Sequence, residues 1–351
     1  MVSTTTTRKQ EVGSDVFSVA TGVWGKKDLF VNYYMVQDED SQAWALIDAG
    51  LKWSAPKIKE MARQLFGENS PPVAIVLTHG HFDHVGALEA LAKEWNVPIF
   101  AHPLELPYLV GASAYPPADP TVGGGMMATM SWMYPRGPID VHEHIKPLPD
   151  DNSIPGLSDW KYLHTPGHSP GHISLFREKD KTLIVGDAFV TTKQESAIFA
   201  LTYKKHLSGP PKYFTCNWAS AKISVLKLAA LDPEIVATGH GYPMYGGEMR
   251  NALHALSRRF DEVAQPLHGR YVNQPAVTDE TGVLFIPPSG EKIPTAAKAI
   301  GISLAVATVG LILYQLTRKA ITEKETTQPI KKSVKKVSHR FKTFNRAFAK
   351  S

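Results

Sequence analysis

Apolar and polar positions repeat with changing periods along the chain, and these changes predict an ordered series of strands and helices. Closely spaced apolar and aromatic runs near the start predict antiparallel strands, and continuous apolar runs further on predict buried strands. Apolar positions repeating every three to four residues predict helices. The predicted strands cover residues 16–24, 29–36, 42–48, 73–79, 97–102, 160–165, 172–177, 181–186 and 234–240, and the predicted helices cover 54–66, 86–95, 220–231 and 248–263.

This order of elements predicts an α/β fold with a two-sheet core and helices outside it. Residues 103–146 interrupt the order with an irregular connection that is rich in Pro, Gly, Met and Tyr. A connection of this length either forms a lid or wall of an active site or packs as a surface excursion, and the sequence leaves these alternatives open. The composition, with 43% hydrophobic and 20% charged residues, is that of a globular protein.

The chain is expected to divide into one large domain and several smaller segments. Residues 1–12 are predicted to be a disordered lead without the apolar core of a secretory signal. Residues 13–265 are predicted to form the main domain. Residues 266–295 contain five prolines and resemble a linker, although the short apolar patch VLFI at 283–286 could dock on the domain.

The segment after this linker predicts attachment to a membrane. Residues 299–316 are largely apolar, and no charge occurs between Lys298 and Arg318. At about 1.5 Å per residue, this run is just long enough for a bilayer core of about 30 Å. We therefore predict a single hydrophobic, transmembrane helix over 296–317. An apolar helix that docks on the domain, or lies in the membrane interface, is the alternative.

The basic residues of the chain are concentrated in its tail, 318–351. This tail contains 11 Lys or Arg against 2 Glu, a net charge of 11 − 2 = +9, so the rest of the chain carries 5 − 9 = −4. The acidic main domain argues against nucleic-acid binding. The positive-inside rule predicts a cytoplasmic tail and an external domain, which conflicts with the missing signal.

We resolve this conflict in favour of a membrane-associated protein whose main domain is cytoplasmic. The apolar segment would either lie on the inner leaflet, with the tail bound to anionic lipids, or form a C-terminal anchor that breaks the charge rule. The single cysteine, Cys216, agrees with a reducing compartment. It also excludes a structural zinc cluster made of several cysteines within this chain, so any metal site must use His and carboxylates.

The densest candidate chemistry follows the predicted buried strand 73–79. Four potential metal ligands, His79, His81, Asp83 and His84, occur within six residues. Neutral imidazoles and carboxylates both suit zinc. Packing such a cluster in a core without a metal would leave polar groups without partners, so a metal site is the favoured interpretation.

Three further motifs carry ligand-type residues. The run HTPGHSPGH places His164, His168 and His172 four residues apart, but its Pro and Gly residues exclude a regular helix. Asp187 follows the predicted strand 181–186, and His240 ends the predicted strand 234–240.

Together these motifs resemble a known family. HGHFDH (79–84), HTPGHSPGH (164–172), GDAF (186–189) and TGHG (238–241) are similar, in the same order, to the motif set of the metallo-β-lactamase superfamily, and Asp48 in LIDAG is similar to its early motif. The resemblance runs from about residue 15 to residue 262. It implies a four-layer αββα sandwich with a repeated half.

The resemblance also implies a two-metal site. His79, His81 and His168 would bind the first metal, Asp83, His84 and His240 the second, and Asp187 would bridge both. Asp48 is a candidate for orienting a ligand or a loop, and His164 and His172 are candidates for supporting a ligand from behind or for packing. The implied cofactor is Zn²⁺, two per chain, with iron or manganese as alternatives.

The implied activity is hydrolysis of an ester, lactone or thioester by a hydroxide held between the two metals, with Asp83 moving protons. The Met- and Tyr-rich stretch 103–135 favours a small, apolar substrate. A mononuclear iron persulfide dioxygenase, a phosphodiester hydrolase and a membrane-bound scaffold without activity remain as alternatives. The oligomeric state is open.

Overall fold

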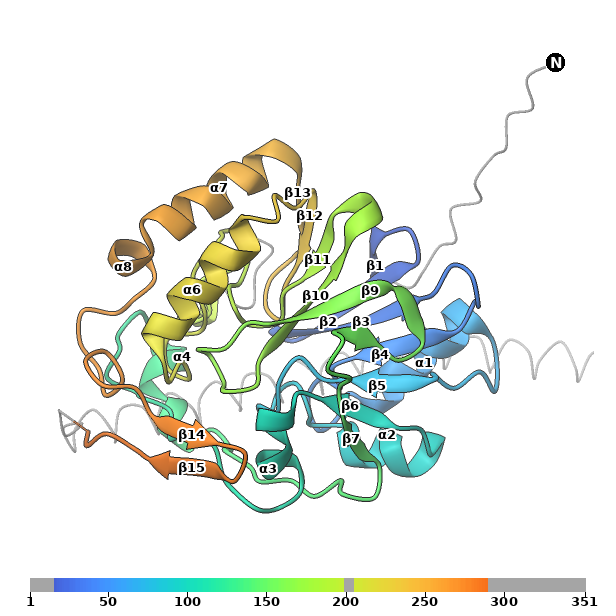
Figure 1. The fold of residues 1–351 in the computed structure, drawn as a ribbon, viewed down its shortest axis with the longest axis horizontal. Helices are drawn as coiled ribbons and strands as arrows, with labels where there is room; N and C mark the ends of the chain where they lie inside the picture. Colours follow the sequence, from blue (N-terminus) through green and yellow to red (C-terminus); the bar gives the residue numbers. More distant parts are fainter. Residues whose placement is uncertain (1–15, 199–204, 290–351) are drawn as a thin grey trace, which may run out of the picture. The chain divides into compact units, whose positions relative to one another are not determined.

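The computed structural model describes residues 16–198 and 205–289, which form a mixed α/β fold around two large sheets (Figure 1). One sheet has seven strands in the order β1-β2-β3-β4-β5-β6-β7, and the other has six in the order β13-β12-β11-β10-β9-β8. The seven strands are β1 (Val16–Ala20), β2 (Val23–Asp28), β3 (Val31–Gln37), β4 (Trp44–Ile47), β5 (Ala74–Val76), β6 (Ile99–Ala101) and β7 (Ile145–Pro147). The six are β8 (Ser153–Ile154), β9 (Leu157–His164), β10 (Ile173–Arg177), β11 (Thr182–Ile184), β12 (Ile235–Ala237) and β13 (Met244–Tyr245).

Helices and a small hairpin complete the described fold. The helices are α1 (Ala55–Phe66), α2 (Leu88–Trp95), α3 (Leu106–Leu109), α4 (Met126–Thr129), α6 (Trp218–Ala229), α7 (Gly246–Arg258) and α8 (Phe260–Val263). Short 3₁₀ turns are η1 (Pro103–Glu105), η2 (Ser131–Met133) and η3 (Glu178–Asp180), and the hairpin consists of β14 (Val277–Asp279) and β15 (Gly282–Phe285).

The first sheet begins antiparallel, as predicted, and becomes parallel from β4 onward. The single strand predicted over 16–24 is instead the start of a hairpin, in which β1 pairs with β2. Gly22, with φ +68°, lies in the turn between them, a backbone conformation that glycine adopts without steric cost. Apolar residues lie on both sides of Thr21 and Gly22, so their periodicity alone does not separate the two strands.

The alternation of side chains along the strands creates two separate cores. In β3, Tyr33 and Met35 pack on the face toward α1 and α2, whereas Tyr34 and Val36 pack against the second sheet. Successive strand residues point to opposite faces of a sheet, so one strand contributes to both cores. The central core between the sheets also contains Trp160 from β9.

Each sheet has helices on its outer face. Leu88 and Leu91 of α2 pack on the first sheet with α1, and Val225 of α6 and Leu253 of α7 pack on the second. Figure 1 shows α6 and α7 on one side of the two sheets and α1 and α2 on the other. The packing therefore has four layers in the order helix, sheet, sheet, helix, and the predicted mixed α/β fold is confirmed.

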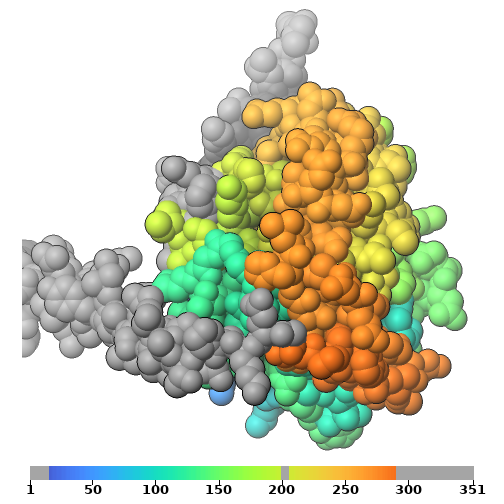
Figure 2. All heavy atoms as spheres, turned by 90° about the vertical axis from the view of Figure 1, so that its left-hand side faces the viewer, coloured from blue at the N-terminus to red at the C-terminus, as the bar shows by residue number. Residues whose placement is uncertain are grey.

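Residues 266–289, the described part of the predicted linker, pack on the domain. Tyr271 and Ala276 are buried in the core beneath α6, and the Tyr271 hydroxyl donates to the carbonyl oxygen of Pro117 at 2.6 Å. Figure 2 shows this orange segment against the body of the domain. Scattered prolines suggested a linker, but buried aromatic and apolar side chains anchor the segment.

Among residues 16–198 and 205–289, no helix is both long and apolar enough to cross a membrane. The predicted lead (1–12), transmembrane helix (296–317) and basic tail (318–351) lie outside the described residues. These three expectations therefore remain predictions from the sequence.

Candidate metal centre

The candidate ligands and the supporting residue Asp48 lie in loops at the carboxyl ends of strands. Asp48 follows β4, the run from His79 to His84 follows β5, Asp187 follows β11 and His240 follows β12. Strands β4 and β5 are parallel, as are β11 and β12, so in each sheet the two loops emerge at the same edge. The backbone N–H of Ile173, at the start of β10, donates to Thr78 O at 2.9 Å and joins the two edges.

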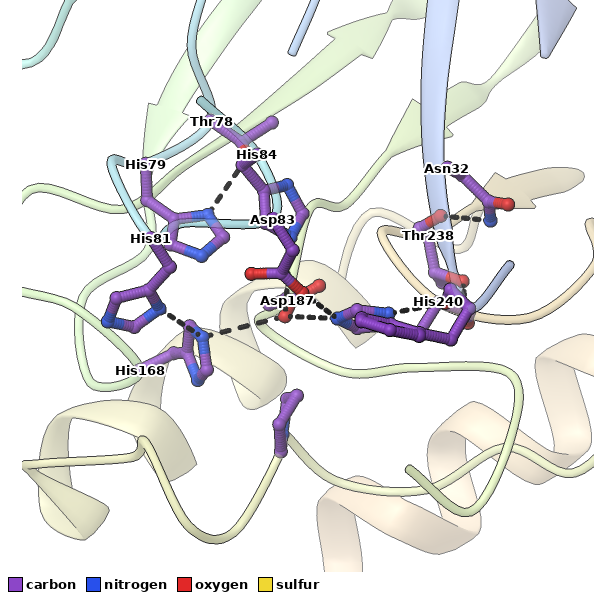
Figure 3. Close-up of polar contacts among 12 residues, drawn as sticks. Asn32, Thr78, His79, His81, Asp83, His84, His168, Asp187, Thr238 and His240 are labelled. Atoms are coloured by element: carbon purple, nitrogen blue, oxygen red, sulfur yellow. Dashed lines mark hydrogen bonds and ion pairs between the residues drawn. The ribbon is translucent and has the colours of Figure 1, made fainter. Parts of the chain in front are cut away.

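Three histidines form the first group of ligand atoms. Nitrogens of His79, His81 and His168 all lie within 4.8 Å of one another. His81 Nδ1 and His168 Nε2 are 2.9 Å apart (Figure 3). The structure thus brings together the three residues expected to hold the first metal, although His168 is separated from His81 by 87 positions.

The second group lies beside the first and shares a carboxylate with it. Ligand atoms of Asp83, His84 and His240 lie within 4.8 Å of one another, as do those of His79, His84 and Asp187. Asp187 Oδ2 is 3.0 Å from His240 Nε2, 3.5 Å from His168 Nε2 and 3.7 Å from His84 Nε2. Figure 3 shows Asp187 between the histidines of the two groups, the place expected of a bridging ligand.

The unsatisfied atoms of this cluster fit a metal site. His79 Nε2, His84 Nε2 and Asp187 Oδ1 are buried and have no hydrogen-bond partner among the described residues. Buried polar atoms are normally paired, because leaving one unpaired costs about 1–3 kcal/mol. Three such atoms in one cluster of imidazoles and a carboxylate are the donor set that zinc and similar divalent ions bind.

Burial and mutual repulsion keep the first group in its neutral, metal-binding form. Burial, reinforced by neighbouring histidines, lowers the pKa of His79 and of His168 well below the ordinary value. Burial likewise lowers the pKa of His81 to about 3. Burial alone would raise the pKa of Asp187, but His240 and His84 hold it well below its usual value. Neutral imidazoles beside an ionised carboxylate are ready to bind a cation.

Asp48 orients two of the candidate ligands. Its Oδ1 accepts a hydrogen bond from the Thr78 backbone N–H, and its Oδ2 lies 2.8 Å from both the Thr78 hydroxyl and His84 Nδ1. The Thr78 hydroxyl, which donates to Asp48, lies 3.1 Å from His79 Nδ1. These contacts assign a proton to Nδ1 of His79 and of His84 and leave Nε2 of each ring for a metal. The supporting role predicted for Asp48 agrees with this geometry.

His168, His240 and Asp187 are oriented in the same way. His240 Nδ1 lies 2.7 Å from the carbonyl oxygen of Phe30, and His168 Nδ1 lies 3.3 Å from the Thr215 hydroxyl. His172 Nε2 accepts a hydrogen bond from the backbone N–H of Asp187 at 2.8 Å. His172 therefore fixes the loop that carries Asp187, which matches its predicted supporting position.

His164 lies apart from these groups. Its ring stacks on that of His102 with centroids 4.0 Å apart, and its Nε2 faces the carbonyl oxygen of Pro170 at 2.9 Å. It belongs to no group of candidate ligand atoms within the described ranges. Of the two roles predicted for His164, packing describes its contacts better than support of a ligand.

Sequence reasoning missed Asn32, which joins the two halves of the fold at the site. Its side-chain amide donates to Thr238 O at 2.8 Å and Gly241 O at 2.5 Å, and its backbone N–H donates to Gly239 O at 2.7 Å. Asn32 thereby holds the loop that carries His240. It lies more than 200 positions from that loop, so no local motif indicated the contact.

Glu105 was missed as well. Its buried carboxylate accepts hydrogen bonds from the backbone N–H groups of Gly80 and Gly171 and from the hydroxyls of Tyr115 and Ser169. Burial raises the pKa of Glu105, and the hydrogen bonds from Tyr115 and Ser169 oppose that increase. No signal in the sequence distinguished this glutamate, which lies in the connection predicted to be irregular.

Aromatic and apolar side chains border the cluster on one side and form what we call the apolar wall. Phe214 stacks on His81 with ring centroids 4.6 Å apart, and Tyr134 contacts both Phe82 and Phe214. Phe82 lies between the candidate ligands His81 and Asp83 in the sequence. The wall consists of Phe82, Ala118, Val122, Met127, Ala128, Tyr134, Tyr213 and Phe214.

Comparisons with known proteins agree with this geometry. The family model described as the metallo-beta-lactamase superfamily matches residues 27–240. The probable metallo-hydrolase YflN of Bacillus subtilis (strain 168) is 44% identical over 248 residues, covering 70% of this chain and 94% of that protein. Hydroxyacylglutathione hydrolase of Halorhodospira halophila (strain DSM 244 / SL1) is 27% identical over 209 residues, covering 58% of this chain and 61% of that protein.

A solved structure of a beta-lactamase domain protein from Burkholderia ambifaria aligns with a TM-score of 0.49 and 20% identity, covering 72% of this chain and 79% of that one. The family match extends over more than half of the chain, and the Bacillus relative matches along nearly its whole length. The chain belongs to the metallo-β-lactamase superfamily.

Proposed function

We propose that this protein is a metal-dependent hydrolase that cleaves a small ester, lactone or thioester. The observation that supports the proposal most is the overlap of the ligand groups. His79 and His84 each belong to two groups, and three buried ligand atoms lack a hydrogen-bond partner within 16–198 and 205–289. Overlapping groups suit two metals held close together. Divalent ions bound there would lower the pKa of a water molecule and polarise a carbonyl oxygen.

The protein itself contributes orientation and proton transfer. Asp83 Oδ2 lies 3.5 Å from His240 Nε2, within the second group of ligand atoms. Burial raises the pKa of Asp83 above its ordinary value, which favours a carboxyl group able to hold a proton. In our proposal a carboxylate oxygen of Asp83 takes a proton from the attacking water and returns it to the leaving oxygen or sulfur.

We propose that the substrate has an apolar group next to the bond that is cleaved. The apolar wall supports this, because Phe82 and Phe214 adjoin His81 and Asp83. An apolar group on the wall would be desolvated there, which contributes about 25 cal/mol per Å² buried. The similarity to a hydroxyacylglutathione hydrolase keeps thioesters among the candidates.

Metal analysis and a substrate panel test the proposal together. The purified protein should contain about two equivalents of zinc, iron or manganese per chain, and it should hydrolyse lactones, esters or thioesters with apolar acyl groups. His84→Ala should lower the metal content toward about one equivalent per chain, Asp187→Asn should lower it further, and both variants should lose most of the hydrolysis. His142→Ala, which removes an exposed histidine whose ring pairs with Asp140, is the matched control and should change neither.

The outcomes separate the alternatives. One iron per chain with oxygen-dependent consumption of a persulfide would favour a dioxygenase, and cleavage of phosphodiesters alone would favour a phosphodiester hydrolase. Protein that binds no divalent metal and cleaves no member of the panel would contradict the proposal and favour a scaffold.

We further propose that residues 299–316 and the basic tail attach the protein to anionic membranes. The support is the sequence alone: an uncharged run between Lys298 and Arg318, followed by a tail with a net charge of 11 − 2 = +9. Juxtamembrane Lys and Arg each contribute about 1 kcal/mol of attraction to an anionic surface. The full-length protein should sediment with anionic vesicles; failure to bind them at low salt would contradict this proposal.

A further inference from the structure

One buried carboxylate connects the two loops that carry the first group of ligands. Glu105 is 0% exposed and accepts from Gly80 N at 2.9 Å and Gly171 N at 2.7 Å. Gly80 lies between His79 and His81, and Gly171 lies three residues after His168. Glu105 therefore ties together backbone segments on both sides of this histidine group.

Two hydroxyl groups complete the environment of this carboxylate. Ser169, directly after His168, donates to Glu105 Oε1 at 2.8 Å, and the Tyr115 hydroxyl donates to Oε2. The Tyr115 ring also packs against His81, with centroids 4.6 Å apart and planes at 61°. Tyr115 thus links the carboxylate to the orientation of one candidate ligand ring.

The glycines of the two loops leave room for this arrangement. A Cβ atom at Gly80 would collide with the Tyr115 hydroxyl, and one at Gly171 would lie 2.8 Å from Glu105 Cγ. Glycine at both positions allows the carboxylate and the hydroxyl to reach the loop backbone. The glycines in the HGH and SPGH sequences are thereby explained by their contacts with Glu105 and Tyr115, which lie outside both motifs.

We propose that Glu105, supported by Tyr115, is a positioning residue that sets the separation of His79 and His81 from His168 and so prepares the first metal position. The proposal rests on the proposed metal centre. Hydrogen bonds behind a ligand hold it in its binding geometry, and their loss typically lowers metal affinity about 10–100-fold. Here the carboxylate acts on the loop backbone rather than on the imidazole rings.

A purely structural role is the competing explanation, and the chain contains a close match for it. The buried carboxylate of Asp38 also accepts from two backbone N–H groups and two hydroxyls, those of Ser41 and Ser158. It joins the β3–β4 turn to β9 rather than the ligand loops. Loss of Asp38 should therefore reduce stability without changing the metal position.

Cobalt(II) binding to the metal-free, full-length protein distinguishes the two roles. Glu105→Gln should weaken one of the cobalt sites about 10–100-fold, measured by competition with a chelator, and should change the visible d–d absorption of the cobalt bound there. Asp38→Asn should lower the unfolding temperature but keep the wild-type cobalt affinity and spectrum. Tyr115→Phe removes one of the four hydrogen-bond donors to Glu105 and should give a smaller change of the same kind. This second variant keeps the proposal testable if the Glu105 variant fails to fold.

Wild-type cobalt affinity and spectrum in both the Glu105 and Tyr115 variants would overturn the positioning role while leaving the metal centre intact. A wild-type protein that binds no cobalt would instead contradict the proposed metal centre and the positioning role together.

Discussion

At the scale of single residues, the candidate ligands depend on side chains that stand behind them. Asp48 faces three hydrogen-bonding groups, the Thr78 N–H, the Thr78 hydroxyl and His84 Nδ1. In either orientation, an asparagine here would turn its NH₂ group toward a donor. We expect Asp48→Asn to lower the affinity for zinc about 10–100-fold, measured by competition with a chelator. Unchanged affinity would show that His84 keeps its orientation without the carboxylate.

The single cysteine lies where a reagent cannot reach it. Cys216 is buried, its Sγ lies 3.7 Å from the carbonyl oxygen of Gly167, and burial raises the pKa of its thiol to about 12. The thiolate is the reactive form, and almost none is present below that pKa. We expect negligible labelling by a thiol reagent at pH 8 in the native protein and complete labelling in denaturant. Rapid labelling of native protein would contradict the burial.

The sequence made the ligands recognisable but not the residues that position them. His79, His81, Asp83 and His84 lie within six positions, a density that ordinary core packing does not produce. Glu105 acts through hydrogen bonds to segments 25 and 66 positions away. A contact between distant segments leaves no local pattern, so it becomes visible only when the fold brings the segments together.

At the scale of elements, helix α6 begins with a cap that also adjoins the His168 loop. The Asn217 side chain accepts from Ser220 N at 3.0 Å, and its backbone N–H donates to Gly167 O at 3.0 Å. Asn217→Ala should therefore destabilise the protein by about 1 kcal/mol, measured by denaturant unfolding of the metal-free protein.

Aspartate is an equally good cap, so Asn217→Asp is the matched control and should remain within a few tenths of a kcal/mol of wild type. Equal stability of the alanine variant would mean that tertiary packing alone defines this end of the helix.

Elements with strong periodicity were predictable, and those defined by a turn or by long-range packing were not. The helix predicted over 54–66 is observed as α1 (Ala55–Phe66), because its apolar positions repeat at helical spacing. The turn at Gly22 and the β14–β15 hairpin escaped prediction. In the first case apolar residues lie on both sides of the turn, and in the second the prolines around 275–288 suggested a linker.

At the scale of the whole molecule, the carboxylate of Asp38 connects the two sheets through its hydrogen bonds with Ser41 and with Ser158 of β9. Burial would raise the pKa of Asp38, but the hydrogen bonds from Ser158 and Ser41 hold it below its ordinary value. A lowered carboxyl pKa stabilises the folded state above the unfolded pKa of about 3.9, and the effect is lost as the pH falls through the folded pKa.

Asp38→Asn should therefore lower the free energy of unfolding by about 2 kcal/mol at pH 7, because the NH₂ group of the asparagine must face one of the two pairs of hydrogen-bond donors. The difference from wild type in unfolding free energy should shrink as the pH falls below about 4. A difference that stays constant from pH 7 to pH 3 would show that shape rather than charge determines the effect.

The seven candidate ligand residues are at most 5% exposed to solvent, and this burial has a consequence for the exchange of bound ions. Few water molecules can stand beside an imidazole or carboxylate that lets go of an ion, so a released ligand atom rebinds the ion before water replaces it. Exchange of a bound ion with a chelator should therefore be slow compared with exchange from a site of the same ligands on an open surface.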